Sequence, residues 1–327
     1  MTARPPGRSA GERPRWRDVD GIVLLDKPTG LGSTPALQRV RRLLRAAKAG
    51  HAGTLDPMAT GMLPLCFGQA TKACGQLLGS GKAYRARVTL GAATDTGDAD
   101  GAVIRSAPVP VVDRAELERT LATLVGSRDH VPPMYSALKH AGRPLYEMAR
   151  RGEEIARAPR RITIHRIELQ DFDAVSLQFD VVCSKGTYIR VLGEELATAL
   201  GTAGHLSALR RLWVEPFEDH AMVTLEAVEA WVADHPAEAE RPAWLLPVDA
   251  AFATLPRFDL DARSSLHLRQ GRELPAPAPA SLAAGELARA YDPASRFLGL
   301  VTCGSAGQIR VERLIVPAAA GEDAETA

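Results

Sequence analysis

Strand-like and helix-like segments are mixed along this chain without a regular strand–helix–strand period. Residues 21–26 form a short apolar run typical of a buried strand, and residues 84–90 and 177–183 alternate apolar and polar side chains as half-buried strands do. Residues 37–47 place apolar side chains at helical spacing. A parallel α/β fold needs strands and helices in alternation. The pattern therefore predicts an α+β domain with a mixed, largely antiparallel sheet and flanking helices.

The length of 327 residues is enough for two domains. We expect the main domain at 20–247, because the composition changes near its end, and a small β-rich domain at 248–317, where short strand-like runs recur. Residues 1–19, rich in Arg, Pro and Gly, and residues 318–327, rich in Ala and Glu, are expected to be disordered tails.

Two regions are strongly basic although the formal net charge is only +1. Residues 39–48 carry five cations and no acid, on a helix that Ser33 or Thr34 is expected to cap, with Pro35 at its first position. Residues 131–161, bounded by prolines, carry seven Lys and Arg and are predicted to form a flap inserted into the sheet domain. Basic surfaces of this kind attract phosphates, although solvated helix faces are the ordinary alternative.

Several other classes of protein are disfavoured. The four cysteines are far apart and form no Cys-x-x-Cys pair, which argues against a zinc site or a disulfide framework and fits a reducing cytoplasm. No apolar stretch approaches the ~20 residues of a membrane span, and the N-terminal region lacks the apolar core of a secretory signal. We therefore expect a cytoplasmic protein with no membrane partner.

Three familiar ligand motifs are nearly present and are rejected. Residues 30–33 lack the third glycine of a dinucleotide fingerprint, and Gly81–Lys82 lacks the flanking residues of a phosphate-binding loop. Residues 95–101 resemble a calcium loop, but no glutamate stands at the twelfth position, so an acidic turn is the better explanation. We expect no cofactor and no metal.

Residues 53–57 place one carboxylate, Asp56, on a tight loop. Gly53 permits close backbone approach and Pro57 fixes the local φ, so the loop is built to hold its side chains in a defined position. From the local chemistry alone, Asp56 is either a turn residue or a nucleophile, and turn residues are the commoner of the two.

Six residues near the ends of predicted elements are candidates for a site. Each has an ordinary structural explanation when taken alone: a turn aspartate, a core or surface histidine, sheet aromatics, an arginine paired with Glu194, and a core leucine. The candidates are His51, Asp56, Tyr84, Tyr188, Arg190 and Leu209.

The order and setting of these residues resemble one family, the bacterial tRNA pseudouridine synthase B family. The resemblance covers roughly residues 20–250, with a weaker likeness to an RNA-binding domain of the PUA type up to about residue 317. Where the family often has two serines after the Lys-Pro turn, this chain has Gly32 and Ser33. The motifs that carry the resemblance are residues 25–30, 51–61, 68–72, 82–85, 91–101, 131–139, 183–190 and 209–212.

The resemblance implies a sheet of the pseudouridine synthase type and an isomerase that converts the uridine at position 55 in the TΨC arm of tRNA to pseudouridine. Asp56 matches the family's nucleophile and Arg190 the arginine that pairs with it. Tyr84 matches a tyrosine stacked on the target base, which is also a candidate for the proton transfers. The remaining three, His51, Tyr188 and Leu209, match positions that contact the extruded nucleotide. Such an enzyme reaches its target by base flipping and needs no cofactor.

The resemblance also implies the partner, which is a tRNA T-arm stem-loop bound by a monomer without a guide RNA. Two alternatives stay open: a non-catalytic RNA-binding or RNA-folding protein, and a guide-RNA-dependent synthase of the dyskerin type. Catalysis and assistance in tRNA folding can coexist. Whether Asp56 attacks the base or the ribose, and which group carries the proton, are also left open.

Overall fold

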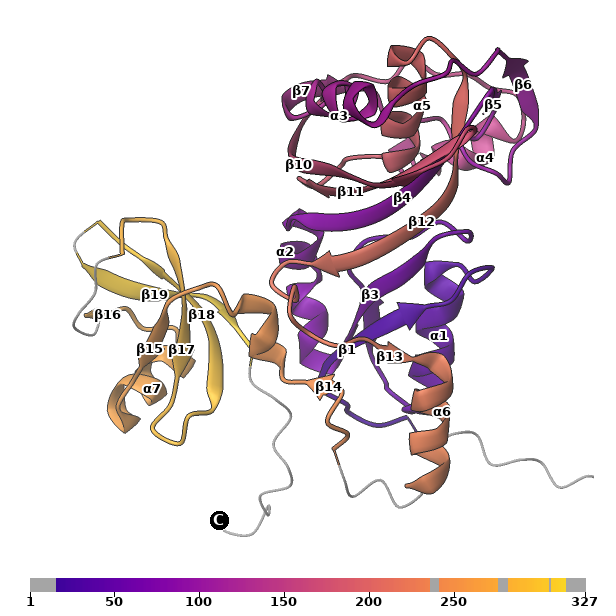
Figure 1. The fold of residues 1–327 in the computed structure, drawn as a ribbon. Coiled ribbons are helices and arrows are strands. Elements are labelled where there is room, and N and C mark those ends of the chain that lie inside the picture. Colours follow the sequence, from indigo (N-terminus) through magenta and orange to yellow (C-terminus); the bar gives the residue numbers. More distant parts are fainter. Residues whose placement is uncertain (1–15, 236–240, 276–281, 306, 316–327) are drawn as a thin grey trace, which may run out of the picture.

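The computed structural model describes residues 16–235, 241–275, 282–305 and 307–315. Its main element is a ten-stranded sheet with the order β13-β1-β3-β12-β4-β11-β10-β7, in which β14 adds to β1 and β2 adds to β3 (Figure 1). Among the described strand pairs of this sheet only β1–β13 and β12–β3 are parallel, so the predicted mixed, largely antiparallel sheet is confirmed. The strands are β1 (Gly21–Lys27), β2 (Ala49–His51), β3 (Thr60–Phe67), β4 (Lys82–Leu90), β7 (Gly126–His130), β10 (Arg160–Phe172), β11 (Ser176–Cys183), β12 (Gly204–Val214), β13 (Val223–Thr224) and β14 (Leu245–Leu246).

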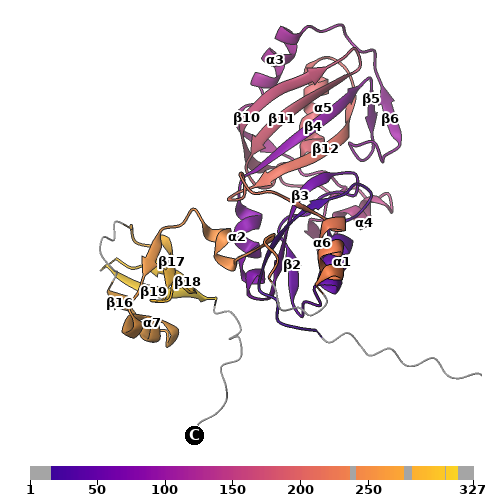
Figure 2. The same cartoon turned by 60° about the horizontal axis from the view of Figure 1, so that its bottom comes forward.

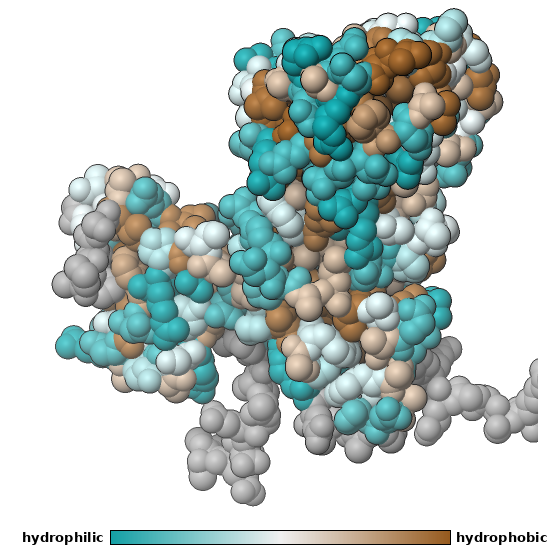
Figure 3. All heavy atoms as spheres, in the orientation of Figure 1, coloured by the Kyte–Doolittle hydropathy of each residue, from teal (hydrophilic) through white to brown (hydrophobic). Residues whose placement is uncertain are grey.

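The alternation in the sequence sets which face of each strand is buried. In β11, Leu177, Phe179 and Val181 are at most 1% exposed, and each such side chain contributes about 1.5–3 kcal/mol of hydrophobic stabilisation. The face of the sheet seen in Figure 3 carries a band of hydrophilic side chains over β11, β4 and β12. These strands also form an exposed ion pair, Arg85–Asp180, at 2.8 Å. The sheet thus has an apolar face for helices and a polar face for solvent.

The helices of the main domain form two groups along the sheet. Figures 1 and 2 both place α3 and α5 at one end of the sheet and α1 and α6 at the other end. Helix α5 follows β11, and its Leu192 and Leu196 are fully buried against the sheet. The helices are α1 (Ser33–Leu43), α2 (Cys74–Gly79), α3 (Arg114–Ala122), α4 (Leu145–Ala149), α5 (Ile189–Ala199), α6 (Leu225–Asp234) and α7 (Ala262–Arg269), with short 3₁₀ turns η1 (Gly68–Ala73) and η2 (Val248–Phe252). No helix in the described ranges combines the length and apolar character needed to cross a membrane.

The start of α1 differs from the prediction. The N-cap is Gly32, not Ser33 or Thr34, and no side chain caps this end of the helix. Ser33 is instead the first helical residue, and Pro35 is the third. The reason is that the Ser33 hydroxyl is already engaged with the backbone of Leu55, which prevents it from serving as a cap.

The basic run around α1 is partly neutralised within the protein. Arg39 pairs with Glu229 of α6 at 2.6 Å, and Arg41 donates to the carbonyls of Ala46 and Ala47 at 3.0 and 2.8 Å. The ordinary explanation, a solvated helix face with local pairing, therefore accounts for part of this run.

The C-terminal part forms the expected small β domain, seen beside the main sheet in Figure 1. Its order is β15-β17-β18-β19-β16. Phe252, Phe297 and Ile22 belong to one buried cluster that joins this domain to the main one, and the Lys72 ammonium donates to the Leu314 carbonyl at 2.9 Å. The strands are β15 (Arg257–Asp259), β16 (Leu274–Pro275), β17 (Leu287–Tyr291), β18 (Phe297–Cys303) and β19 (Gln308–Leu314).

The predicted insertion at 131–161 lies between β7 and β10 and contains a short hairpin, β8 (Lys139–His140) and β9 (Arg143–Pro144), followed by α4. The predicted acidic turn at 95–101 links β5 (Ala92–Thr94) to β6 (Val103–Ser106). The domain boundaries stay predictions, and most of both predicted tails lies outside the described residues.

Candidate active site

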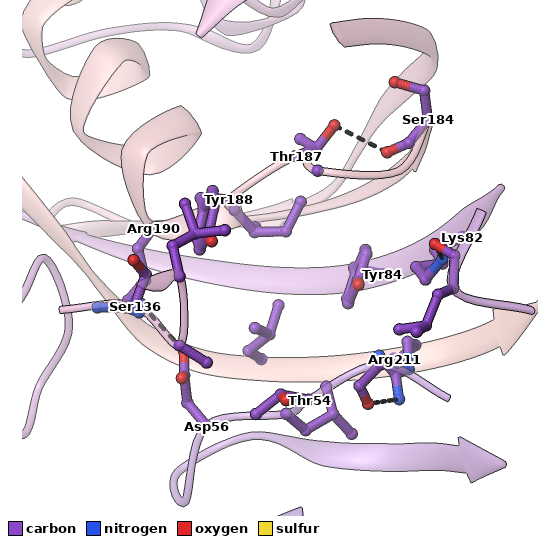
Figure 4. A pocket seen from close by; sticks show the side chains of 18 residues that line it. Thr54, Asp56, Lys82, Tyr84, Ser136, Ser184, Thr187, Tyr188, Arg190 and Arg211 are labelled. Atoms are coloured by element: carbon purple, nitrogen blue, oxygen red, sulfur yellow. Dashed lines mark hydrogen bonds and ion pairs between the residues drawn. The ribbon is translucent and has the colours of Figure 1, made fainter. Parts of the chain in front are cut away.

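A cavity of about 320 Å³ lies between the loop that precedes β3, the inner strands β4 and β12, and the turn that leads into α5 (Figure 4). Five of the six predicted site residues line it, although they are distant in the sequence. They are Asp56, Tyr84, Tyr188, Arg190 and Leu209. The sixth, His51, lies in β2 opposite Leu65 and is not among the lining residues.

The carboxylate of Asp56 pairs with the guanidinium of Arg190. Asp56 Oδ2 lies 3.1 Å from Arg190 Nε, and the second carboxylate near this nitrogen, Asp98 Oδ2, lies at 3.6 Å. The Asp56 side chain is 37% exposed, whereas those of Arg190 and Asp98 are 6% and 7% exposed. Figure 4 shows Arg190 reaching from the start of α5 to Asp56 at the cavity edge. Arg190 thus pairs with Asp56 and Asp98, in place of the Glu194 pairing considered from sequence.

The other two nitrogens of Arg190 bind backbone carbonyls. Nη1 donates to Thr96 at 2.7 Å and Nη2 to Tyr135 at 2.6 Å. Thr96 lies in the acidic turn, and Tyr135 lies at the start of the insertion. One side chain therefore ties together three segments of the cavity wall, and a planar guanidinium can do this without moving.

Burial raises the pKa of Asp56 above its usual value, and the charge of Arg190 opposes that rise. The nearby Asp98 carboxylate adds to the rise. Arg190 thus favours an ionised Asp56 without fully compensating its desolvation.

Ser33 holds the loop that carries Asp56. Its hydroxyl donates to the Leu55 carbonyl at 3.0 Å and accepts from the Leu55 N–H at 2.8 Å. Ser33 and Leu55 are 4% and 3% exposed, so water does not replace these bonds. The residue next to the nucleophile candidate is therefore fixed at both of its peptide groups. Sequence reasoning missed this role, since the same serine fits a helix cap equally well.

Lys27 supports the far side of the same loop. Its ammonium is completely buried and donates to the carbonyls of Pro28, Leu31 and Pro57 at 2.9, 2.6 and 3.3 Å. Burial lowers the pKa of Lys27 to about 8, while the Asp56 carboxylate opposes the shift. The sequence signal was the Lys-Pro turn itself, which was recognised as part of a motif but given no role.

Arg211 forms the floor of the cavity beneath Tyr84. The two residues face each other across the β12–β4 pair, and the Arg211 charge acts on the Tyr84 phenol. Arg211 is 1% exposed and donates to the carbonyls of Met62 at 2.6 Å and Gly53 at 3.2 Å. Burial raises the pKa of Tyr84, and the Arg211 charge opposes the rise. Arg211 was not predicted. The only signal in the sequence is that Arg211 is a cation at an inward-facing position of β12, where the other inward-facing residues are apolar.

His130 holds the turn that carries Tyr188. Its Nε2 accepts the Tyr188 backbone N–H at 3.0 Å, and the two rings stack with centroids 6.1 Å apart. His130 is 1% exposed, and burial lowers its pKa to about 4. The imidazole is therefore neutral at physiological pH and acts as an acceptor at the start of α5.

Lys82 also lines the cavity, and its contacts agree with the rejection of a phosphate-binding loop at this position. Its ammonium donates to the carbonyls of Leu77, Leu78 and Ser80 at the end of α2, at 3.4, 3.4 and 2.7 Å. Among the described residues no group of three or more His, Cys, Asp or Glu side chains is arranged to hold a metal ion.

The comparisons with known proteins agree with this geometry. Residues 41–189 match the model of the TruB family pseudouridylate synthase N-terminal domain, residues 190–253 that of the tRNA pseudouridylate synthase B C-terminal domain, and residues 256–315 that of the pseudouridine synthase II TruB C-terminal region. A tRNA pseudouridine synthase B of Aromatoleum aromaticum is 52% identical over 303 residues, covering 93% of this chain and 95% of that protein. The protein of the same description in Chromohalobacter salexigens is 48% identical over 303 residues, covering 93% and 96%.

Among solved structures, a Cbf5–Nop10–Gar1 complex contains a chain that matches with a TM-score of 0.71 at 24% identity, covering 91% of this chain and 85% of that one. This similarity shows that the fold is shared. The family models and the similar proteins show that the chain is a pseudouridine synthase, an enzyme of the isomerase type. At 48–52% identity over nearly its whole length, the chain belongs to the TruB family, as the sequence motifs predicted.

Proposed function

We propose that this enzyme converts the uridine at position 55 in the TΨC arm of tRNA to pseudouridine, with Asp56 as the nucleophile. The observation that carries the proposal is the Asp56–Arg190 pair at 3.1 Å on the edge of a cavity whose floor holds Tyr84. The relatives described above are named for tRNA, and the motifs that carry the resemblance include every residue that lines the cavity except Leu78.

The reaction breaks the N-glycosidic bond of the uridine, rotates the uracil and joins it to the ribose through carbon. It is an isomerisation with no net redox change, so it requires a nucleophile, a place for the base and a proton carrier. Asp56 supplies the first, either at the base or at the ribose. Tyr84 supplies a ring on which the base can stack and a phenol beside the Arg211 charge. Leu209 and Tyr188 line the remaining walls.

The target uridine lies inside a folded arm, so it must leave the stack to reach Asp56, at a cost of a few kcal/mol. Phosphate contacts from the exposed cations of the insertion, such as Lys139 and Arg143, can offset that cost. We assign the C-terminal β domain a second RNA contact.

The test uses purified full-length chain and an isolated T-arm stem-loop with no added RNA or protein. Pseudouridine formed at the target uridine is mapped chemically. The wild type is expected to turn over, and Asp56→Asn is expected to lose turnover while binding the RNA within tenfold of wild type. Asp95→Asn, on an exposed carboxylate of the neighbouring turn, is the matched control.

Two results would count against the proposal. Turnover by Asp56→Asn at a tenth of the wild-type rate would remove the nucleophile assignment. Binding without turnover by the wild type would favour one of the two alternatives, and adding guide RNA would then separate a guided synthase from a pure RNA-binding protein.

A further inference from the structure

A second hollow, of about 170 Å³, lies inside the 131–161 insertion and its junction with β10. We call it the flap hollow. It is larger than a single water site, for which roughly 30 Å³ suffices. Its lining residues are Pro132, Leu138, Lys139, His140, Leu145, Ile155, Ala156, Arg157, Ala158 and Arg160.

The lining of the flap hollow is cationic. Three of its described residues, Lys139, Arg157 and Arg160, carry a positive charge, His140 adds an imidazole, and no carboxylate is among them. None of the three cations forms an ion pair within the described parts of the chain. The cations of α1 differ, since Arg39 there is paired with Glu229. The positive charge around the hollow is therefore uncompensated by the protein.

Arg157 carries the strongest indication of a ligand. Its Nε and Nη1 are buried from solvent and have no hydrogen-bond partner in the described structure. A buried charged donor without a partner is costly, and such groups are rare in native proteins. A guanidinium presents two forks that match two oxygens of a phosphate, Nε with Nη2 and Nη1 with Nη2. Each fork of Arg157 therefore includes one of the two buried nitrogens that have no partner in the described structure.

The flap hollow adjoins the active-site cavity. Leu138 lines both, so one side chain is the wall between them. On the other side, burial raises the pKa of the Tyr188 phenol and the nearby Arg160 charge opposes the rise, which places Arg160 close to a wall of the cavity. A nucleotide in the cavity therefore brings its backbone to the mouth of the hollow.

We propose that the flap hollow binds one phosphodiester of the RNA backbone next to the nucleotide held in the active-site cavity, with Arg157 as its main ligand and Lys139 and Arg160 beside it. The proposal rests on the proposed function, because it assumes that the cavity holds a nucleotide of an RNA chain. It assigns the insertion a defined phosphate subsite in addition to a diffuse basic surface.

The experiment uses full-length protein and the T-arm stem-loop, made with native linkages or with one neutral methylphosphonate linkage on either side of the target uridine. Affinity is measured over a series of KCl concentrations for wild type and Arg157→Gln. Arg151→Gln is the matched control, since Arg151 is an exposed arginine of the same insertion outside the hollow. Lys139→Gln is a second variant in the hollow, and turnover at saturating RNA reports whether each variant is folded.

Arg157→Gln is expected to weaken binding of native RNA about tenfold and to lower the slope of log affinity against log salt by ~0.7–0.9, the value of one lost phosphate contact. One of the two neutral linkages is expected to abolish the difference between wild type and Arg157→Gln, with a smaller effect of the same kind for Lys139→Gln. Neither linkage should mask any effect of Arg151→Gln.

The proposal is overturned if Arg157→Gln changes the slope no more than Arg151→Gln does, or if its effect persists in full on both neutral-linkage RNAs. A third result would also overturn the proposal. If inorganic phosphate at constant ionic strength competes with RNA in an Arg157-dependent manner, but neither neutral linkage changes the effect of Arg157→Gln, the hollow is a site for free phosphate. Failure of the proposed function would give a different result from failure of the phosphate subsite, because the wild type would then form no pseudouridine in the native stem-loop.

Discussion

Ser33→Ala tests whether one hydroxyl holds the loop that carries Asp56. The substitution removes the two hydrogen bonds to Leu55, at 3.0 and 2.8 Å, and leaves a buried N–H and a buried carbonyl without a partner. Each unsatisfied group costs about 1–3 kcal/mol. Alanine, the better helix former, returns roughly 0.5 kcal/mol at the start of α1. We therefore expect a net loss of about 1.5–5.5 kcal/mol of unfolding free energy.

The effect on turnover is expected to exceed the effect on stability. Leu55 precedes Asp56 directly, so a loosened peptide moves the carboxylate relative to Arg190. A displacement of about 1 Å in a reacting group can cost on the order of 100-fold in rate. Urea denaturation measures the stability, and single-turnover pseudouridine formation with saturating T-arm RNA measures the chemical step. Thr34→Ala, one residue along on an exposed position, is the control.

The result that refutes this reasoning is a Ser33→Ala protein with stability within 0.5 kcal/mol of wild type and an unchanged single-turnover rate, since surface substitutions stay within about that range. Loss of stability with full turnover would show that the hydroxyl supports the fold but does not position Asp56. Equal losses in Ser33→Ala and Thr34→Ala would assign the effect to the helix start and not to the loop.

Two further predictions concern the supports of the cavity. Arg211→Lys should keep RNA affinity within a few-fold and lower the single-turnover rate tenfold or more, because a single ammonium cannot reach Met62, Gly53 and the Tyr84 phenol together; an unchanged rate would contradict this role. His130 is neutral in the folded protein, because its pKa there is about 4, compared with 6.5 in the unfolded chain. Between pH 6.5 and pH 4 the unfolded chain therefore binds more protons than the folded protein. Its contribution, about 3 kcal/mol, is complete above pH 6.5 and lost towards pH 4. Urea midpoints should fall less steeply with acid in His130→Gln, and parallel pH curves for the two proteins would count against it.

The strands and helices that carry the cavity could be predicted because burial imposes a period on the sequence. The alternation of residues 177–183 reports the two faces of β11, and the spacing of Leu192 and Leu196 reports the buried stripe of α5. Where both faces are buried, as in most of β1, the period disappears and only the apolar run remains. That is why the extension of β1 to Lys27 was missed.

The residues that support the cavity could not be predicted by the same means. Ser33, Lys27 and Arg211 act on backbone carbonyls or N–H groups, and a carbonyl leaves no trace in the sequence. Ser33 looks like a cap because its partner, Leu55, lies 22 positions away. Arg211 follows Arg210 in β12. Which of the two points inward depends on the alternation of side chains along this strand, and register shifts interrupt that alternation.

The contacts of Arg190 explain why motifs that are far apart in the sequence line one cavity. Its three nitrogens bind three segments: the loop of Asp56, the acidic turn at Thr96 and the start of the insertion at Tyr135. Two of these bonds go to uncharged carbonyls, so only the contacts of Nε with the carboxylates of Asp56 and Asp98 respond to ionisation of the partner. A change in any one segment would move the guanidinium away from the carboxylate. The three segments that contact Arg190 are therefore required together, and the sequence of any one of them does not reveal this requirement.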